Sequence, residues 1–331
     1  MRIGKNIFML AAAFFFFGFS AAIAQDKPLE KVTIAQYGKE RILFYLPLYV
    51  AIEEGLFAKH GLDVGLTFAG TPDHVFAAVI SNDAQFGVSD PAFTAISHDK
   101  GGPGKVVAML ITKLAVSGAA KNAMPAIKHP QQLNGLRIAS PPEPSTTYTL
   151  INGLKRSFHL DTTIVQVPPG EQIALLDAGK ADLALDFEPN VSIAEDKGYH
   201  VVFDLAAFTD PQVITGVTTT EDFIKSHSDT VQKLADGLQE AIDLIYNEPD
   251  VAFRVGAKSF PHLSDKIVRS AVNRMLNAHM YPRSIAVPDG FWQRTLKTRL
   301  DNGDLKKPQE TSVAVDNDFA LQAQKDASGT K

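Results

Sequence analysis

YLPLYVAIEEGLFAKHGLDVGLTFAG, residues 45–70, is the stretch that decides the fold of this chain. Its apolar residues from 48 to 57 predict a short helix. The Lys-His-Gly run at 59–61 should end that helix, because its glycine can adopt the left-handed conformation of a C′ residue. A strand is expected directly behind it at 62–68, and another ahead of it at 31–36. Together these segments predict one β-α-β crossover of a doubly wound sheet.

Short strands alternate with short helices through the middle of the chain. The expected strands lie at residues 84–88, 105–116, 136–139, 163–167, 181–187 and 200–203. This alternation predicts parallel α/β sheets in both halves, and a length of 331 residues favours two lobes over one core. The C-terminal third is instead helical, with a 3.6-residue apolar stripe at 230–246 and further helices near 249–259, 264–279 and 288–302.

The first 24 residues have the pattern of a secretory signal. Arg2 and Lys5 form a positive start, residues 7–19 are unbroken apolar chain, and Ala-Ile-Ala at 22–24 offers a cleavage site. A membrane anchor is the alternative, but the apolar core is short for a span of about 20 residues. We therefore expect residues 1–24 to be a cleaved signal peptide and the mature protein to be periplasmic and soluble.

Composition narrows the function classes. The chain has no cysteine, which excludes disulfides, a lipidated anchor, thiol chemistry and thiolate–zinc sites. It has 32 basic and 37 acidic residues, and loss of Arg2 and Lys5 would leave 30 against 37, a net charge of −7. An acidic chain without a basic cluster is a poor candidate for nucleic-acid binding.

The position of a ligand site follows from the expected fold. In a doubly wound sheet, ligands bind outside the carboxyl ends of the strands, where helix N-termini point backbone N–H groups into a crevice. This rule selects five loops, which fall in both halves of the chain: residues 36–44, 70–74, 89–92, 141–147 and 186–190. The candidate ligand-binding residues in these loops are Tyr37, Arg41, Thr71, Ser89, Asp90, Ser145, Thr146, Thr147, Asp186, Phe187 and Glu188.

The loop at 141–147 is the most distinctive of the five. Three prolines stiffen it, and Ser145, Thr146 and Thr147 place hydroxyls and free N–H donors at the start of a helix. Such an end suits an anionic or carbonyl oxygen of a ligand. Plain N-capping is the alternative, because one of the three would cap the helix in any protein.

Two carboxylates and an aromatic ring follow a later strand. Strand alternation points Asp186 and Glu188 to the same side, where a carboxylate could accept hydrogen bonds from an amine or an aminopyrimidine edge. Phe187 could stack on a flat ring. The alternative is that these acids cap a helix or are simply solvated.

The remaining loops offer cations and further polar groups. Lys39 and Arg41 are the cations of the first loop and could neutralise a sulfonate or a phosphate. Asp90 is the natural N-cap of the helix behind it, whereas Ser89 is expected to face the cleft. The aromatic residues Tyr37, Phe44 and Tyr45 could wall a pocket or fill core.

Motifs for catalysis are missing from the sequence. The nine histidines form no metal-binding helical pair, and there is no P-loop, no G-x-S-x-G and no G-x-G-x-x-G. We expect no catalytic residue, no metal and no cofactor. The alternative is a cofactor-free enzyme with an acid/base pair drawn from Asp90, Asp186 and Glu188.

Six segments in order resemble the substrate-binding proteins of ABC importers that carry sulfonates, nitrate and thiamine-precursor pyrimidines. They are PLYVAIEEGLFAKHGLDV (47–64), AVISNDAQFGVSDPA (78–92), NGLRIASPPEPSTTYTL (134–150), ALLDAGKADLALDFEPN (174–190), DTVQKLADGLQEAIDLIYNEPD (229–250) and VDNDFA (315–320). The chain departs from this family in having Phe187 where many members have tryptophan. It also lacks the cysteine-rich motif of the fungal pyrimidine synthases, so that enzymatic branch is not supported.

The resemblance implies a two-lobed type II periplasmic-binding-protein fold, each lobe a mostly parallel sheet flanked by helices. It implies lobe 1 from residues 25–117 and 218–331, lobe 2 from 118–217, and crossovers near 115–120 and 210–217. A monomer would close on a small molecule and present it to a membrane permease. A pyrimidine and a sulfonate such as taurine both remain open as ligands. Enzymes such as the menaquinone-pathway dehydratases share this fold but work in the cytosol, and the signal sequence argues against that class.

Overall fold

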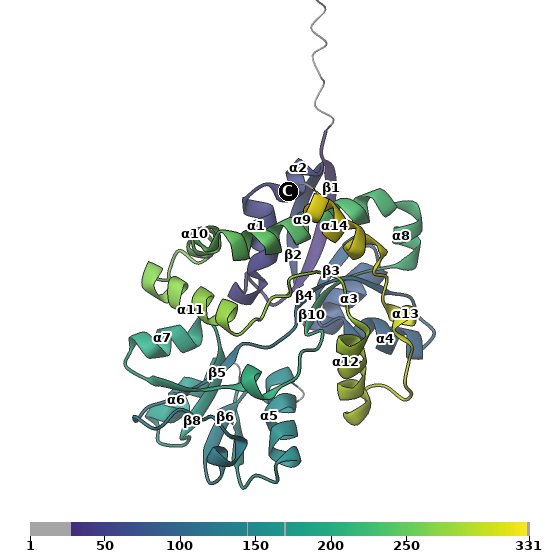
Figure 1. Ribbon diagram of the computed structural model, residues 1–331. Coiled ribbons are helices and arrows are strands. Elements are labelled where there is room, and N and C mark those ends of the chain that lie inside the picture. Colours follow the sequence, from purple (N-terminus) through teal and green to yellow (C-terminus); the bar gives the residue numbers. More distant parts are fainter. Residues whose placement is uncertain (1–27, 144, 169, 330–331) are drawn as a thin grey trace, which may run out of the picture.

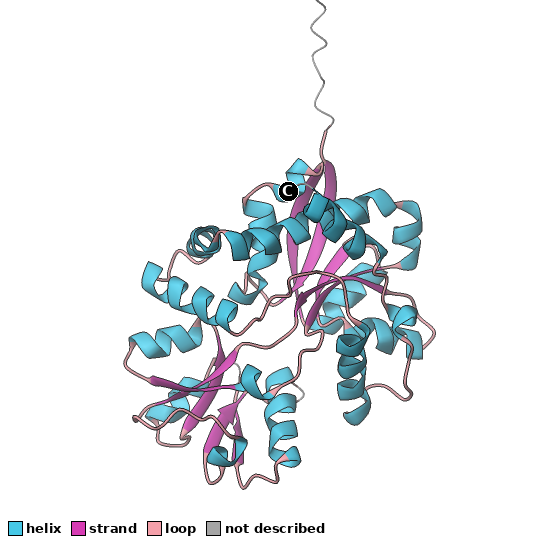
Figure 2. Ribbon diagram, in the orientation of Figure 1, coloured by secondary structure: helices cyan, strands magenta, loops and turns pink. Residues whose placement is uncertain are grey.

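The computed structural model describes residues 28–329 except 144 and 169. It contains two five-stranded sheets, each covered by helices, with the first sheet above the second in Figure 1. Figure 2 shows helices on the outside of both sheets and loops between them. The expected signal peptide at 1–24 lies outside the described residues.

The first sheet has the strand order β2-β1-β3-β10-β4, and the second has β7-β6-β8-β5-β9. In each sheet, one strand that follows a crossing between the sheets, β10 or β5, runs antiparallel to both of its neighbours. The bounds are β1 Glu30–Tyr37, β2 Leu62–Gly70, β3 Phe86–Ser89, β4 Lys105–Ile111, β5 Val116–Ala120, β6 Arg137–Ser140, β7 Thr163–Gln166, β8 Leu183–Phe187, β9 His200–Asp204 and β10 Thr215–Thr219.

The helices cover both sheets and fill the C-terminal third. Their bounds are α1 Leu46–Glu53, α2 Leu56–Lys59, α3 Pro72–Ile80, α4 Ala92–Asp99, α5 Thr146–Ser157, α6 Gln172–Asp177, α7 Asn190–Asp196, α8 Glu221–Ser226, α9 Ser228–Asn247, α10 Pro249–Ser259, α11 Asp265–Asn277, α12 Asp289–Asp301, α13 Thr311–Ala314 and α14 Asp318–Gly329. Short 3₁₀ helices lie at Leu43–Tyr45, Pro130–Leu133 and Leu205–Phe208.

The β-α-β crossover expected around residues 45–70 is confirmed. Strands β1 and β2 pair in parallel, with Glu30 opposite Leu62, and Gly61 between α2 and β2 has φ +88°. The single expected helix is in fact two, because Gly55 adopts φ +69° and separates α1 from α2. A left-handed residue cannot continue an α-helix, and glycine adopts this conformation without a steric penalty.

The chain crosses between the sheets twice, after β4 and after β9. Because Val116 already pairs in the second sheet and Thr215 already pairs in the first, the crossings lie at 112–115 and 205–214. The lobe limits at 117 and 217 remain a proposal. The strand pairing places both boundaries a few residues earlier in the chain. Each sheet has its own apolar cluster, so the two lobes have separate main cores.

The amphipathic segment expected at 230–246 forms α9, which returns to lobe 1. Its buried face, including Leu234, Leu238 and Ile242, joins the main core of the first sheet together with α1, α10 and α11. The C-terminal third therefore completes lobe 1 rather than forming a third unit.

The packing of α9 against α2 reverses the usual effect of a glycine-to-alanine change. A Cβ on Gly237 would lie 2.7 Å from Cδ1 of the buried Phe57 ring, so Gly237→Ala should lower the free energy of unfolding by about 1–3 kcal/mol. Gly153 in α5 has nothing within 4 Å of such a Cβ, so Gly153→Ala should raise it by up to about 1 kcal/mol. Urea unfolding of both variants checks the prediction. A change of the same sign in the free energy of unfolding of both variants would contradict it.

Candidate functional site

A cavity of about 600 Å³ lies where loops of the two lobes meet. The first lobe contributes residues 37 and 40–44 together with 259, 260 and 262, and the second contributes 170, 186–190 and 193. Two of the five loops selected from the sequence, 36–44 and 186–190, therefore line one cavity. The carboxyl ends of β1 and β8 place them there, as the rule for doubly wound sheets requires.

The loop behind β1 is fixed by a buried tyrosine. The Tyr49 hydroxyl donates to Gln36 Oε1 at 3.0 Å and accepts from the backbone N–H of Ile42 at 2.8 Å. Gln36 in turn donates to the carbonyl of Glu40 at 3.3 Å. Burial raises the pKa of Tyr49 to about 12, so the hydroxyl keeps the proton that it donates.

Arg41 is paired within lobe 1 with Glu53, a carboxylate that it shares with Lys258. Its Nη2 lies 2.9 Å from Glu53 Oε1, its Nη1 donates to Ser259 Oγ at 2.8 Å, and its guanidinium covers the Tyr49 ring. Lys39 is exposed and is not among the residues that line the cavity. Among the described residues, the lining therefore presents no arginine or lysine that lacks a carboxylate partner.

Asp186 is the buried acid of the opposite wall. Its Oδ1 accepts from the backbone N–H of Phe187 at 2.8 Å, and both of its oxygens lie 3.3 Å from Asn190 Nδ2. Burial raises the pKa of Asp186 to about 6, and the neighbouring Glu188 adds to the rise. At pH 7 the group is therefore a carboxylate, held in an environment that disfavours its charge.

Glu188 also lines the cavity, but its carboxylate is bound within the protein. Oε1 accepts from Arg274 Nε at 2.6 Å, and Oε2 accepts from the backbone N–H of Ser192 at 3.1 Å. The side chain is 1% exposed. Glu188 is therefore a bridge between the lobes, and its role as a ligand acceptor stays a prediction.

Aromatic rings from both lobes meet at the cavity. Phe44 and Phe187 have ring centroids 5.7 Å apart with an interplanar angle of 43°. Tyr37 lines the same wall, whereas Tyr45 is buried in the core of lobe 1. The pair Phe44–Phe187 thus gives the cavity an aromatic surface on which a flat ligand could stack.

The hydroxyl residues at the start of α5 lie apart from this cavity. Ser145 is the N-cap, since its Oγ accepts from the backbone N–H of Tyr148 at 3.2 Å. Thr147 is buried, and its Oγ1 has no hydrogen-bond partner among the described residues. Thr146 lines a much smaller hollow with Asp90 and residues of α12. The N-capping alternative is confirmed for Ser145.

Of the candidates at the ends of β2 and β3, Asp90 is bound and Ser89 is buried within lobe 1, whereas Thr71 is exposed. Asp90 Oδ1 accepts from the backbone N–H of Ala92 at 2.9 Å, and Oδ2 pairs with Arg299 of α12. Ser89 is 1% exposed and lies opposite Gly216 in the sheet. Thr71 is the exposed N-cap residue of α3. Ligand contacts by these three residues remain predictions.

Several residues around the cavity were not found by sequence reasoning. Gly170, Asn190, Ser259 and His262 line it, and Arg274 and Arg299 hold the carboxylates of two predicted residues. Asn190 lies within a selected loop, where its acidic neighbours were the stronger candidates. Gly170 lies in the loop behind the strand expected at 163–167, which was not among the five selected loops. Ser259, His262, Arg274 and Arg299 belong to the helical C-terminal third, so no rule on strand ends could select them.

Among residues 28–329, apart from the two gaps, no group of three or more His, Cys, Asp or Glu side chains is arranged to hold a metal ion. In the same part of the chain, no helix has the length and apolar character needed to span a bilayer.

More than half of the chain, residues 44–252, matches the family described as NMT1/THI5 like. The chain belongs to the NMT1/THI5-like family. Among relatives of this NMT1/THI5-like chain is the Bacillus subtilis (strain 168) protein named "Putative binding protein YtlA". The two are 24% identical over 311 residues, which cover 91% of this chain and 92% of YtlA.

Solved structures share the fold of this NMT1/THI5-like protein. The periplasmic aliphatic sulphonate binding protein SsuA of Escherichia coli superposes with a TM-score of 0.69 at 16% identity, covering 87% of this chain and 92% of SsuA. The desulfurization enzyme DSZB superposes with a TM-score of 0.64 at 13% identity, covering 90% of this chain and 99% of DSZB. The two-lobed periplasmic-binding-protein fold is thus confirmed. The binding-protein relatives support a solute-binding role, although the same fold also carries an enzyme.

Proposed function

We propose that this protein is a periplasmic receptor that captures a small polar organic ligand between its lobes and delivers it to the permease of an ABC importer. The observation that carries this proposal is the 600 Å³ cavity lined by strand-end loops of both lobes. A ligand held by two lobes favours their closure, and closure gives a permease a shape to recognise. The signal-like residues 1–24 and the binding-protein relatives support export and solute binding. We propose a monomer as the working form.

The cavity favours an amine-bearing flat ring over a sulfonate. Asp186 and Glu40 bring negative charge to the lining, while the guanidinium of Arg41 is already bound to Glu53 and Ser259. An oxyanion there would face carboxylates without a free arginine or lysine, which is unfavourable. A ring amine or a protonated ring nitrogen could donate to Asp186 and stack against Phe44 and Phe187.

A thermal-shift screen of the purified protein tests the ligand class. We expect aminopyrimidines to raise the melting midpoint at micromolar concentration, and taurine, alkanesulfonates and nitrate to leave it unchanged. Calorimetry should then show at least about tenfold weaker binding to Asp186→Asn, since one charged hydrogen bond contributes roughly 1.5–3 kcal/mol.

Asp182→Asn is the matched control for that variant. Asp182 lies at the other end of β8, where it pairs with Arg137 on the surface, so its loss should leave affinity unchanged. If an alkanesulfonate raised the melting midpoint and aminopyrimidines did not, the proposed ligand class would be wrong, but the proposed receptor function would stand. Binding of none of these compounds would count against the cavity as the site of capture.

A cofactor-free enzyme is the second candidate, and the raised pKa of Asp186 favours it. A carboxylate with a pKa of about 6 can act as a general base near neutral pH. Of the three acids considered for an acid/base pair, Asp90 and Glu188 are held by arginines. Mass spectrometry of a bound ligand after prolonged incubation separates the two functions, because a receptor returns it unchanged and an enzyme does not.

A further inference from the structure

Helix α11 of lobe 1 packs against helix α7 of lobe 2 (Figure 1). The apolar face of α11, including Val268 and Val272, belongs to the core of the first sheet. Helix α7 instead buries Ala194 against the second sheet. Any movement of one lobe relative to the other must therefore change the contact between these two helices.

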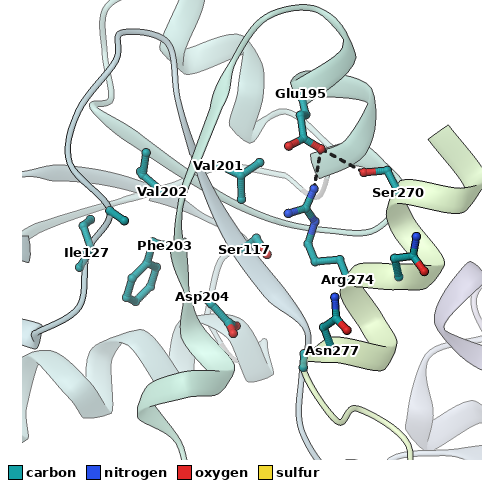
Figure 3. A pocket seen from close by; sticks show the side chains of 13 residues that line it. Ser117, Ile127, Glu195, Val201, Val202, Phe203, Asp204, Ser270, Arg274 and Asn277 are labelled. Atoms are coloured by element: carbon teal, nitrogen blue, oxygen red, sulfur yellow. Dashed lines mark hydrogen bonds and ion pairs between the residues drawn. The ribbon is translucent and has the colours of Figure 1, made fainter. Parts of the chain in front are cut away.

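Arg274 of α11 crosses this boundary and binds two carboxylates of lobe 2. Its Nε donates to Glu188 Oε1 at 2.6 Å, and its Nη2 donates to Glu195 Oε2 at 2.6 Å. Figure 3 shows the guanidinium pointing at Glu195, whose carboxylate also accepts from Ser270 Oγ at 3.0 Å. The Arg274 side chain is 24% exposed and that of Glu188 is 1% exposed. One charged group of this network is thus almost fully removed from water.

The Arg274–Glu188 pair stands between two cavities. Glu188 lines the ligand cavity described above. Arg274 lines a second cavity of about 590 Å³ beside β5 and β9. Lobe 2 contributes Ser117 and Asp204 to this second cavity, and α11 contributes Asn277 (Figure 3). The pair therefore joins the lobes at a point where space lies on both sides of it.

We propose that Arg274 is a positioning residue that holds the two lobes closed over the ligand cavity. Opening the lobes would carry Arg274 away from Glu188 and let water reach both charges. Closing the lobes without Arg274 would bury the Glu188 carboxylate beside Asp186 with no cation, which is strongly unfavourable. The charge of Glu188 thus makes closure depend on Arg274. This inference rests on the lobe motion of the proposed function and not on the identity of the ligand.

The same helix provides a matched control. Lys266 of α11 also bridges the lobes, with Nζ 2.6 Å from Asp196 Oδ1, but its side chain is 79% exposed. Exposed ion pairs contribute little, because water solvates both charges equally well when they separate. Lys266→Gln should therefore leave the lobe equilibrium unchanged although it removes an inter-lobe ion pair from the same contact.

Distance measurements on the ligand-free protein test the proposal. Because the chain has no cysteine, Glu248→Cys in lobe 1 and Lys180→Cys in lobe 2 provide two unique sites for spin labels. Pulsed electron paramagnetic resonance then reports the distribution of inter-lobe distances. We expect Arg274→Gln to raise the population at altered, open-lobe distances severalfold, Arg274→Lys to raise it less, and Lys266→Gln to match the parent.

A double variant distinguishes this role from a merely structural one. Glu188→Gln removes the charge that Arg274 must neutralise, so adding Arg274→Gln to it should open the lobes little further. Equal opening by Arg274→Gln in both backgrounds would overturn the proposal, as would a distance distribution of Arg274→Gln identical to the parent. Because no ligand is used, a negative result leaves the proposed receptor function untouched, and failure of every ligand screen leaves this measurement valid.

Discussion

Asp186→Asn should raise the free energy of unfolding at pH 7.5 by about 2–3 kcal/mol. The folded protein holds the pKa of Asp186 at about 6 because the carboxyl is buried, against an ordinary value of 3.8. A pKa difference of one between the folded and unfolded chains corresponds to about 1.4 kcal/mol of stability. The contribution of this group to stability is full below about pH 4 and is lost as the pH rises through 6. The asparagine variant lacks that loss.

Urea unfolding of both proteins between pH 4 and 7.5 checks this expectation. The difference in unfolding free energy between Asp186→Asn and the parent should grow over that interval and level off above pH 7. Asp182→Asn is the control of opposite sign, because its hydrogen bond to Arg137 holds the pKa of Asp182 below the ordinary value. If the unfolding free energies of Asp186→Asn and the parent changed in parallel with pH, burial would not raise the pKa of Asp186.

Asp90→Ala should lower the free energy of unfolding by about 3 kcal/mol, as expected when one partner of a mostly buried ion pair is removed. Arg299 is 17% exposed, and the carboxylate of Asp90 raises its pKa. Asp304, 2.9 Å from the same guanidinium, would remain as a partner. The variant also loses the hydrogen bond from the backbone N–H of Ala92 to Asp90 at the start of α4.

Chemical denaturation measures this loss, and Asp301→Ala provides the comparison. Asp301 pairs with Lys297 on the surface of α12, the helix that carries Arg299. Its removal should therefore change the free energy of unfolding by less than about 0.5 kcal/mol. Arg299→Met in the Asp90→Ala background should recover part of the loss, because it removes a mostly buried guanidinium that has lost one of its two carboxylate partners. Unchanged stability together with lost ligand binding would instead assign Asp90 to the ligand.

The fold could be predicted because its signals are local. The glycine at 61, the alternation of 62–68 and the stripe of 230–246 each fix an element without reference to the rest of the chain. The break at Gly55 could not be predicted in this way, because the apolar residues on both sides of it continue one helical pattern. A periodic pattern reports which face is buried and does not report a change of backbone conformation at one residue.

The candidate site could be predicted only in part. Strand ends select loops 36–44 and 186–190, and both line the cavity. The partners of their charged residues could not be found this way. Arg274 meets Glu188 across 86 positions of sequence. The apolar pattern in the sequence of α11 shows which side of this helix enters the core. It does not show which helix of the other lobe packs beside that apolar side.

The position of β10 sets the order in which the lobes can form. All five strands of the second sheet lie between residues 116 and 204, so this sheet is complete once that segment has left the ribosome. In the first sheet β10 lies between β3 and β4, and those two strands have no direct pairing with each other. Until residue 219 emerges, the N-terminal strands remain two separate fragments with open edges. The N-terminal lobe is thus the last to complete its sheet, although its first strand is the first to leave the ribosome.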